Sequence, residues 1–283
     1  MVGAPDLRAE TLAPFSGDLA TAFEKLARLG YDGIELMARD PGVLDGSKIR
    51  GWLEESQLGF VGVCTGHVFF EDGLGLIGPG PHVSHHAVAR LKELIDLAAA
   101  ISPQDALVNI GRARGMGEPR NLERTRQVAE EVFRELATYA EPRGVRIALE
   151  PLSSKEASFV LSTDEGIQMV ERVNSASFGL LMDVYHMNLT DRSITEAFRR
   201  AGPRCWHVHV SDANRQSPAP GTFDYQAIIG VLVENGYSGY LTTEIQPWPN
   251  PDAAARASIR FLRKYVPSAG DKFVPAKGVG HGR

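Results

Sequence analysis

The chain has 283 residues, is 43% hydrophobic and 23% charged, and carries a formal net charge of -5, all ordinary values for a globular protein. This balance gives no basic footprint, so we expect no nucleic-acid partner. The apolar runs are too short to cross a membrane and the first residues lack a signal-peptide core, so we expect no membrane association and a cytoplasmic location. Two cysteines, Cys64 and Cys205, imply no disulfide framework and are expected to be inert core residues.

The first half of the chain alternates short β-like runs with longer amphipathic stretches. In the helical stretches apolar residues recur at spacings of three and four, and glycine closes the first of them. A long Gly-rich loop that could form a lid or a substrate wall is expected over residues 65–85. The predicted helices are 19–30, 48–59 and 87–101, and the predicted strands are 32–37, 60–64 and 106–110.

The second half begins with a long predicted helix over residues 123–144 and then repeats one rhythm four times. Each repeat is a short strand followed by an amphipathic helix. The predicted strands are 146–150, 178–183, 206–210 and 240–244, and the helices that follow them are 163–174, 194–202, 224–236 and 253–266.

Strands that alternate with helices of this length indicate βαβ units and parallel pairing. Seven strands are clear, and an eighth is expected somewhere in residues 2–15, so the sequence predicts an α/β single-domain (β/α)₈ TIM barrel over residues 1–266. Residues 267–283 are expected to be a C-terminal tail, surface-laid or disordered. The alternative is an open doubly wound sheet, but no GxGxxG loop follows the first strand.

Four successive strands end in a residue that is able to bind a metal. Alternation along each strand points all four side chains into the barrel, at the carboxyl end where barrel enzymes place their chemistry. Burying several carboxylates together is unfavourable unless a cation or tight pairing offsets their charge, although any one of them could also be a strand-end cap. An oxygen-rich set favours one divalent ion, Mn²⁺ first and Mg²⁺ or Co²⁺ as alternatives. The four residues are Glu150, Asp183, His209 and Glu244.

Several motifs together resemble the sugar phosphate isomerase/epimerase superfamily, the xylose isomerase-like TIM barrels, and within it the D-tagatose 3-epimerase branch. The resemblance is strongest between residues 144 and 247, and the stretches GYDGIELM and IDLAAAI also fit it. The motifs that carry it are ALEPLSSKE, LLMDVYHMNL, HVHVSDANRQSPAPG and YLTTEI.

The resemblance implies a metal held by the four strand-end residues, with Glu150 and Glu244 exchanging a proton on opposite faces of one substrate carbon. It also implies substrate contacts from Glu156, His186 and Arg215. His207, one layer deeper than His209, is expected to support the site rather than to ligate. Asp212 is expected to orient the loop that carries Arg215.

The sequence does not decide the roles of several other polar residues. His67 and Glu71, in the long loop after Cys64, are further substrate-contact candidates. Arg112 and Arg114 could bind an anion or face solvent. His82, His85 and His86 lie near a helix start, where a solvated helix end is favoured over a second metal site.

The function expected is a divalent-metal-dependent isomerase or epimerase that acts beside the carbonyl of a ketose or a related sugar or polyol ketone. Two alternatives stay open. One is a metal-dependent lyase or dehydratase of the inosose or 3-dehydroshikimate type, or one that cleaves a C-glycoside. The other is a non-catalytic sugar-binding barrel. A homodimer or homotetramer is a family expectation.

Overall fold

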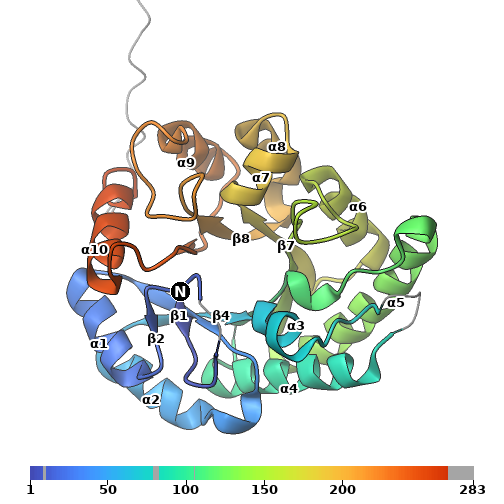
Figure 1. The fold of residues 1–283 in the computed structure, drawn as a ribbon, viewed down its shortest axis with the longest axis horizontal. Helices are drawn as coiled ribbons and strands as arrows, with labels where there is room; N and C mark the ends of the chain where they lie inside the picture. Colours follow the sequence, from blue (N-terminus) through green and yellow to red (C-terminus); the bar gives the residue numbers. More distant parts are fainter. Residues whose placement is uncertain (9–10, 79–82, 105, 267–283) are drawn as a thin grey trace, which may run out of the picture.

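The computed structural model describes residues 1–8, 11–78, 83–104 and 106–266 (Figure 1), so the tail expected at 267–283 lies outside the described residues. Within these residues, nine parallel strands form one sheet in the order β2-β1-β3-β4-β5-β6-β7-β8-β9. The strands are β1 (Val2–Gly3), β2 (Phe15–Ser16), β3 (Gly33–Met37), β4 (Gly59–Cys64), β5 (Ala106–Ile110), β6 (Val145–Leu149), β7 (Phe178–Asp183), β8 (Cys205–Val210) and β9 (Leu241–Thr243).

The sheet curls until its two edges meet, which makes the barrel that the sequence predicts. The backbone N–H of Ile245, just after β9, donates to the carbonyl of Leu12, just before β2, at 3.0 Å. The expected first strand is present as two short parallel strands, because the chain leaves the sheet after Gly3 and returns at Phe15. The predicted TIM barrel is confirmed.

Helices surround the strands, and α10 lies beside α1, which completes the outer ring (Figure 1). The α-helices are α1 (Leu19–Leu29), α2 (Gly46–Ser56), α3 (Gly66–Asp72), α4 (His85–Ile101), α5 (Leu122–Ala140), α6 (Thr163–Val173), α7 (Val184–Thr190), α8 (Ile194–Ala201), α9 (Tyr225–Glu234) and α10 (Pro251–Leu262). The 3₁₀ turns are η1 (Pro41–Val43), η2 (Arg112–Arg114), η3 (Pro119–Asn121), η4 (Glu141–Arg143) and η5 (Gly202–Arg204).

Local sequence chemistry sets the helix boundaries. The side chains of Ser84, Ser162 and Ser193 each accept a backbone N–H in the first turn of α4, α6 and α8. Gly30 ends α1 in the left-handed conformation, with a φ of 86°. Among the described residues, no helix has both the length and the apolar character that crossing a bilayer requires.

Two helices, α3 and α7, were not expected from the sequence. Both have only seven residues, and two turns are too few for apolar periodicity to reveal a helix. The prediction of a continuous loop over residues 65–85 is therefore wrong for its first third, which forms α3. Gly73 ends α3 with a φ of 65°, and Val68 anchors it in the core.

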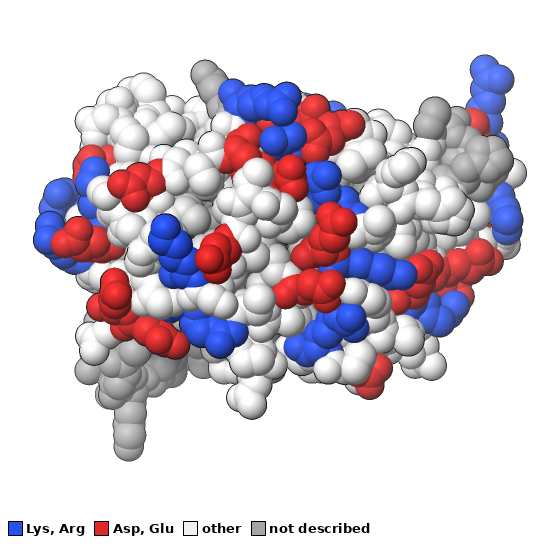
Figure 2. All heavy atoms as spheres, turned by 90° about the horizontal axis from the view of Figure 1, so that it is seen from below, with Lys and Arg blue, Asp and Glu red and all other residues white. Residues whose placement is uncertain are grey.

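The barrel interior is built in layers. Below the carboxyl end, a small apolar cluster of Val61, Leu107, Ala148 and Leu181 lies in the barrel interior. Outside the strands, residues such as Ile147 pack against the helices in the main core. On the flank shown in Figure 2, acidic and basic side chains are intermingled. The polar layer described below therefore rests on an apolar floor.

A close contact between β4 and β5 leads to a prediction about Gly62 in β4. A Cβ atom there would lie 2.1 Å from the carbonyl oxygen of Leu107 in β5, so a side chain would push the paired strands apart. We expect Gly62→Ala to lower the free energy of unfolding by about 1–3 kcal/mol, measured by urea denaturation. A Cβ atom added at Gly230 in α9 would meet nothing within 4 Å, so Gly230→Ala is the control, expected to be neutral or stabilising. Equal midpoints for the native protein and Gly62→Ala would contradict this packing.

Candidate metal centre and substrate pocket

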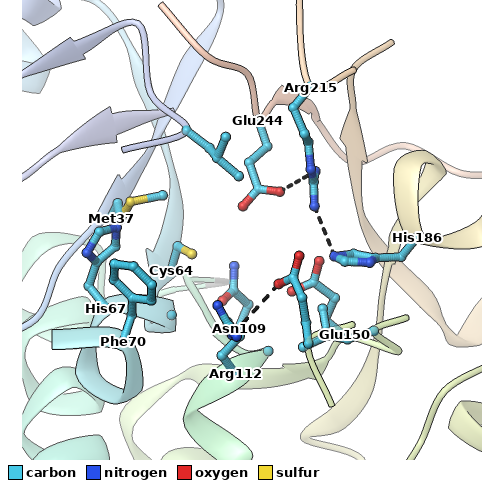
Figure 3. A pocket seen from close by; sticks show the side chains of 15 residues that line it. Met37, Cys64, His67, Phe70, Asn109, Arg112, Glu150, His186, Arg215 and Glu244 are labelled. Atoms are coloured by element: carbon cyan, nitrogen blue, oxygen red, sulfur yellow. Dashed lines mark hydrogen bonds and ion pairs between the residues drawn. The ribbon is translucent and has the colours of Figure 1, made fainter. Parts of the chain in front are cut away.

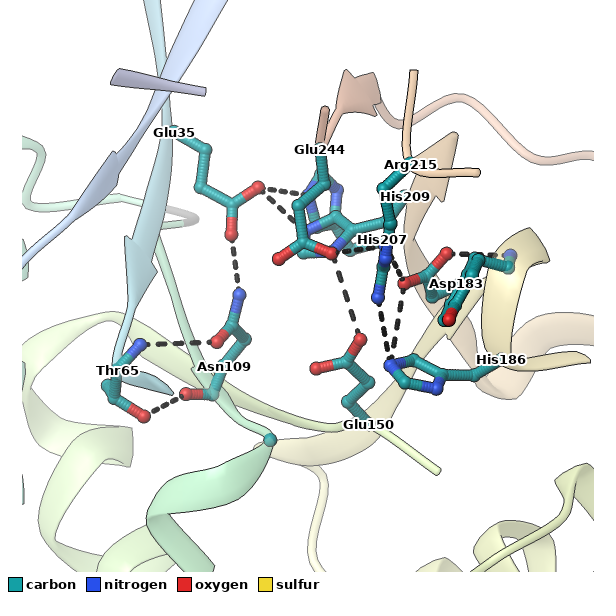
Figure 4. A network of polar contacts seen from close by, with 12 residues as sticks. Glu35, Thr65, Asn109, Glu150, Asp183, His186, His207, His209, Arg215 and Glu244 are labelled. Atoms are coloured by element: carbon teal, nitrogen blue, oxygen red, sulfur yellow. Dashed lines mark hydrogen bonds and ion pairs between the residues drawn. The ribbon is translucent and has the colours of Figure 1, made fainter. Parts of the chain in front are cut away.

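The four strand-end residues predicted from the sequence come together at the carboxyl end of the barrel (Figure 4). Their side chains are all buried, and one donor atom from each lies within 4.8 Å of the donor atoms of the others. Glu150 directly follows β6, Asp183 ends β7, His209 lies in β8 and Glu244 directly follows β9. The parallel register, which pairs Asp183 with His209, delivers them to one level. This cluster is able to bind a metal ion.

The two ring nitrogens of His209 differ: one is hydrogen-bonded, and the other has no hydrogen-bond partner among the described residues. Its Nε2 lies 3.0 Å from Glu35 Oε2, and since a carboxylate only accepts, Nε2 carries the proton. Its Nδ1 is buried, has no hydrogen-bond partner within the described part of the chain, and lies 3.5 Å from Glu244 Oε2 and 3.9 Å from Glu150 Oε1. A buried ring nitrogen aimed at two carboxylates fits a cation between them.

Glu35 lies behind the cluster and was not identified from the sequence. Its Oε2 also accepts from His207 Nε2 at 2.7 Å, and its Oε1 accepts from Asn109 Nδ2 at 2.5 Å. His207 thus supports the site through Glu35, as expected for a residue one layer deeper. A signal for Glu35 was present, because it is the lone charge in the strand GIELM and shares its inward parity with Gly33 and Met37.

The charges in the cluster are strongly coupled. Burial, together with the neighbouring carboxylate of Glu244, raises the pKa of Glu150 well above its usual range. Burial alone would lower the pKa of His209, but Glu35 and Glu244 outweigh it and hold that pKa well above its usual value. Three buried carboxylates around one imidazole are an oxygen-rich donor set, and that set fits a hard divalent cation.

Arg215 supplies positive charge at the edge of the cluster. Its Nη1 donates to Asp183 Oδ2 and to Glu244 Oε2, both at 2.6 Å. Its Nη2 lies 2.9 Å from His186 Nε2, and its guanidinium carbon lies 4.1 Å from the centre of the Tyr185 ring. The guanidinium therefore contacts Asp183 and Glu244 directly. The sequence predicted only a substrate contact for Arg215, so its observed position is closer to the cluster than expected.

The loop after β8 holds Arg215 in this position. Asp212 Oδ1 accepts the backbone N–H groups of Asn214 and Gln216, both at 2.7 Å. Arg215 itself has a φ of 58°, in the left-handed region that a non-glycine residue seldom adopts. The interpretation of Asp212 as the residue that orients this loop agrees with these contacts.

A cavity of about 190 Å³ opens above the cluster (Figure 3). Glu150 and Glu244 line it, whereas Asp183 and His209 are 1% and 0% exposed and lie deeper. Met37, Cys64 and Phe70 form an apolar wall opposite the polar one (Figure 3). The structure brings to this cavity four of the residues predicted to contact substrate, namely His67, Glu156, His186 and Arg215.

Several other expectations are refined by the structure. Cys205 is buried, but Cys64 lines the cavity as well as being buried. Glu71 holds His67 at 2.8 Å instead of facing the cavity. His82 lies outside the described residues, while His85 and His86 are exposed at the start of α4.

The two arginines after β5 have different surroundings. Arg112 lines the cavity, and its Nε lies 3.8 Å from Glu156 Oε2. Arg114 is fully buried and bonds to backbone carbonyls, so both expectations for it, a solvent-facing loop and an anion site, are wrong. The sequence did not reveal this because three of the four carbonyls lie 36 to 46 residues further along the chain.

The chain belongs to the xylose isomerase-like TIM barrel family, whose sequence profile matches residues 23–265. It is 23% identical to a probable ketose 3-epimerase of Synechocystis sp., over 88% of this chain and 92% of the relative. It is 25% identical to L-ribulose 3-epimerase of Methylomonas sp., over 81% of each chain. A crystal structure of D-psicose 3-epimerase with D-tagatose, from Clostridium cellulolyticum H10, has a TM-score of 0.77 at 22% identity and covers 93% of this chain and 98% of that one. The expected family and fold are confirmed, and the names of the relatives agree with the expected isomerase or epimerase.

The contacts of Arg215 make a prediction for the metal-free protein. Replacing it by methionine leaves Asp183 and Glu244 buried without their cation, so Arg215→Met should lower the free energy of unfolding by about 3–5 kcal/mol. Urea denaturation in the presence of a chelator measures this. The control is Arg204→Met, because Arg204 forms an exposed pair with Glu171, for which a loss of at most about 1 kcal/mol is expected. Equal losses for the two variants would mean that Arg215 does not balance the buried carboxylates.

Proposed function

We propose that the protein is a divalent-metal-dependent isomerase or epimerase that moves a proton beside the carbonyl of a ketose or a related sugar or polyol ketone. The observation that carries the proposal is the placement of Glu150 and Glu244. These two carboxylates come from strands β6 and β9, border one small cavity, and share a buried cluster with Asp183 and His209.

The four clustered residues are proposed as the metal ligands, with His209 binding through Nδ1. Carboxylate oxygens outnumber nitrogen in this set, which favours Mn²⁺, with Mg²⁺ or Co²⁺ as alternatives. When bound, the ion would polarise the substrate carbonyl and make the adjacent C–H bond more acidic. Glu35 would keep the proton of His209 on Nε2 and leave Nδ1 free to ligate.

Glu150 and Glu244 are proposed as the two proton-transfer groups. They project into the cavity from different sides (Figure 3), so one can remove the proton from a carbon between them while the other returns a proton to the opposite face. The environments of the two acids differ. Burial beside Glu244 raises the pKa of Glu150, whereas the nearby Arg215 and His209 overcome the effect of burial and lower the pKa of Glu244. A pair with unequal pKa values suits an exchange in which one group carries the proton and the other does not.

Substrate recognition is assigned to the polar groups of the cavity. Glu156, His186, Arg215 and His67 offer donors and acceptors that suit the hydroxyl groups of a sugar. The named substrates of the relatives, which include ribulose and psicose, support a ketose. We further propose a cytoplasmic enzyme, with a homodimer or homotetramer as its assembly.

The proposal is tested by incubating the Mn²⁺-loaded protein with a panel of ketoses in D₂O and following the products by NMR. An epimerase gives a stereoisomer that has lost no atoms except one carbon-bound hydrogen, which is replaced by deuterium at the inverted carbon. Glu150→Gln and Glu244→Gln should each lower turnover by about 10²- to 10⁴-fold, because either loss removes a proton-transfer group. Glu171→Gln, an exposed substitution, should leave turnover unchanged.

Other products would redirect the assignment. Loss of water, seen as a lower product mass, would indicate a lyase or dehydratase that uses the same acids. Full turnover by Glu150→Gln or Glu244→Gln would remove that residue from proton transfer. Recovery of every sugar unchanged and without deuterium would favour a non-catalytic sugar-binding protein over an enzyme.

A further inference from the structure

Arg114, in η2 after β5, is a guanidinium buried completely in the protein. It is 0% exposed and is the largest of the fully buried side chains among the described residues. A buried charge is strongly unfavourable unless hydrogen bonds or a partner charge offset it. Burial lowers the pKa of Arg114 to about 10, so the group still carries its charge near neutral pH. Such a residue requires an explanation.

The hydrogen bonds of Arg114 go to main-chain carbonyls. Its Nη1 donates to the carbonyl oxygens of Gly111 at 3.2 Å and Glu150 at 2.5 Å. Its Nη2 donates to those of Phe159 at 3.1 Å and Val160 at 3.0 Å. The planar fork of arginine can reach two pairs of acceptors at once, which a lysine ammonium cannot do in the same geometry.

Three of these four carbonyls, those of Glu150, Phe159 and Val160, belong to the two ends of one loop. Glu150 begins the segment 150–160, Phe159 and Val160 end it, and Glu156 lies between them. The backbone N–H of Leu152 also donates to Val160 O, at 3.3 Å. Arg114 therefore closes the base of the loop that carries both a proposed proton-transfer acid and a proposed substrate contact.

The end of this loop is held in an unfavourable backbone conformation. Val160 has a φ of +54°, which is uncommon for any non-glycine residue and more so for a β-branched one. A strained residue persists only where surrounding contacts over-determine it. Here the contacts on its carbonyl come from Arg114 and Leu152.

Arg114 also fixes the strand end against which the Glu150 side chain lies. A Cβ atom on Gly111 would be 2.5 Å from Glu150 Oε2, so the carboxylate occupies the space that the glycine leaves open. Arg114 binds the carbonyls of both Gly111 and Glu150, and the backbone N–H of Glu150 donates to Ile110 O at 3.1 Å. One guanidinium thus fixes the spacing between β5 and the carboxylate.

We propose that Arg114 is a positioning residue that closes the loop 150–160 and thereby places Glu150 and Glu156 at the cavity. It acts through the main chain and does not touch substrate. The catalytic meaning of this placement rests on the proposed function, but the closure of the loop can be measured without any substrate.

The test is hydrogen–deuterium exchange by mass spectrometry on the full chain, comparing the native protein with Arg114→Met. Methionine has a long apolar side chain but no donors. We expect amide exchange in residues 152–160 to rise at least about tenfold, since several charge-assisted hydrogen bonds are lost, while the strands on the far side of the barrel change by less than about twofold.

The matched control is Phe23→Leu. Phe23 is buried in α1, on the opposite side of the ring from α6 (Figure 1), and its truncation destabilises the protein through a core defect. In Phe23→Leu, the amide exchange rate of the loop 150–160 should rise no more than that of the residues around the loop. If Arg114→Met does not fold, Arg114→Lys, which keeps the charge but loses the fork, should show the same local increase.

The second readout is the steady-state kinetics of each variant with a ketose that the native protein converts, measured well below the melting temperature of the variant. Misplacement of the acids should lower kcat/KM by about 100-fold in Arg114→Met. A loop that exchanges as slowly as in the native protein, or exchange that rises evenly over the whole chain, overturns the proposal. A local rise in a protein that turns over no sugar upholds the role of Arg114 and removes the proposed function instead.

Discussion

The site depends on one electrostatic constraint, the burial of three carboxylates around a single imidazole at the carboxyl end of the barrel. Like charges this close cannot all ionise in a dry interior without compensating positive charge. Arg215 compensates Asp183 and Glu244 from the loop after β8, whereas no arginine among the described residues forms an ion pair with Glu150, whose pKa is raised by burial and by Glu244. Nδ1 of His209, which is buried and has no hydrogen-bond partner among the described residues, faces the same place, and a divalent cation there would balance the remaining negative charge.

Support for this cluster comes from three directions. Behind it, Glu35 links His207, His209 and Asn109, which sets the orientation of the imidazole and connects it to the cavity wall. In front of it, Asp212 shapes the turn that brings in Arg215. Beside it, Arg114 closes the loop that carries Glu150. Each of these supporting side chains uses hydrogen bonds to hold another residue in place, which is how a scaffold keeps a reactive site in one geometry.

The sequence predicted the parts of this architecture that follow from local periodicity. Alternation along four strands was enough to place Glu150, Asp183, His209 and Glu244 on one side of the barrel wall. It was not enough for Glu35, whose partner His209 lies 174 residues away, or for Arg114, three of whose four acceptors belong to a loop without regular structure. The short helix α3 was missed for a different reason, because seven residues carry too little periodicity. Long-range contacts and short irregular elements are the information that one sequence does not display.

The central claim is that the four side chains converge on one divalent cation. Anomalous diffraction from a crystal soaked in Mn²⁺ tests it most directly. We expect a single strong anomalous peak at coordination distance from the carboxylates of Glu150, Asp183 and Glu244 and from Nδ1 of His209. A cluster that stays free of manganese while the ion binds elsewhere, or a His209 that ligates through Nε2, would contradict it.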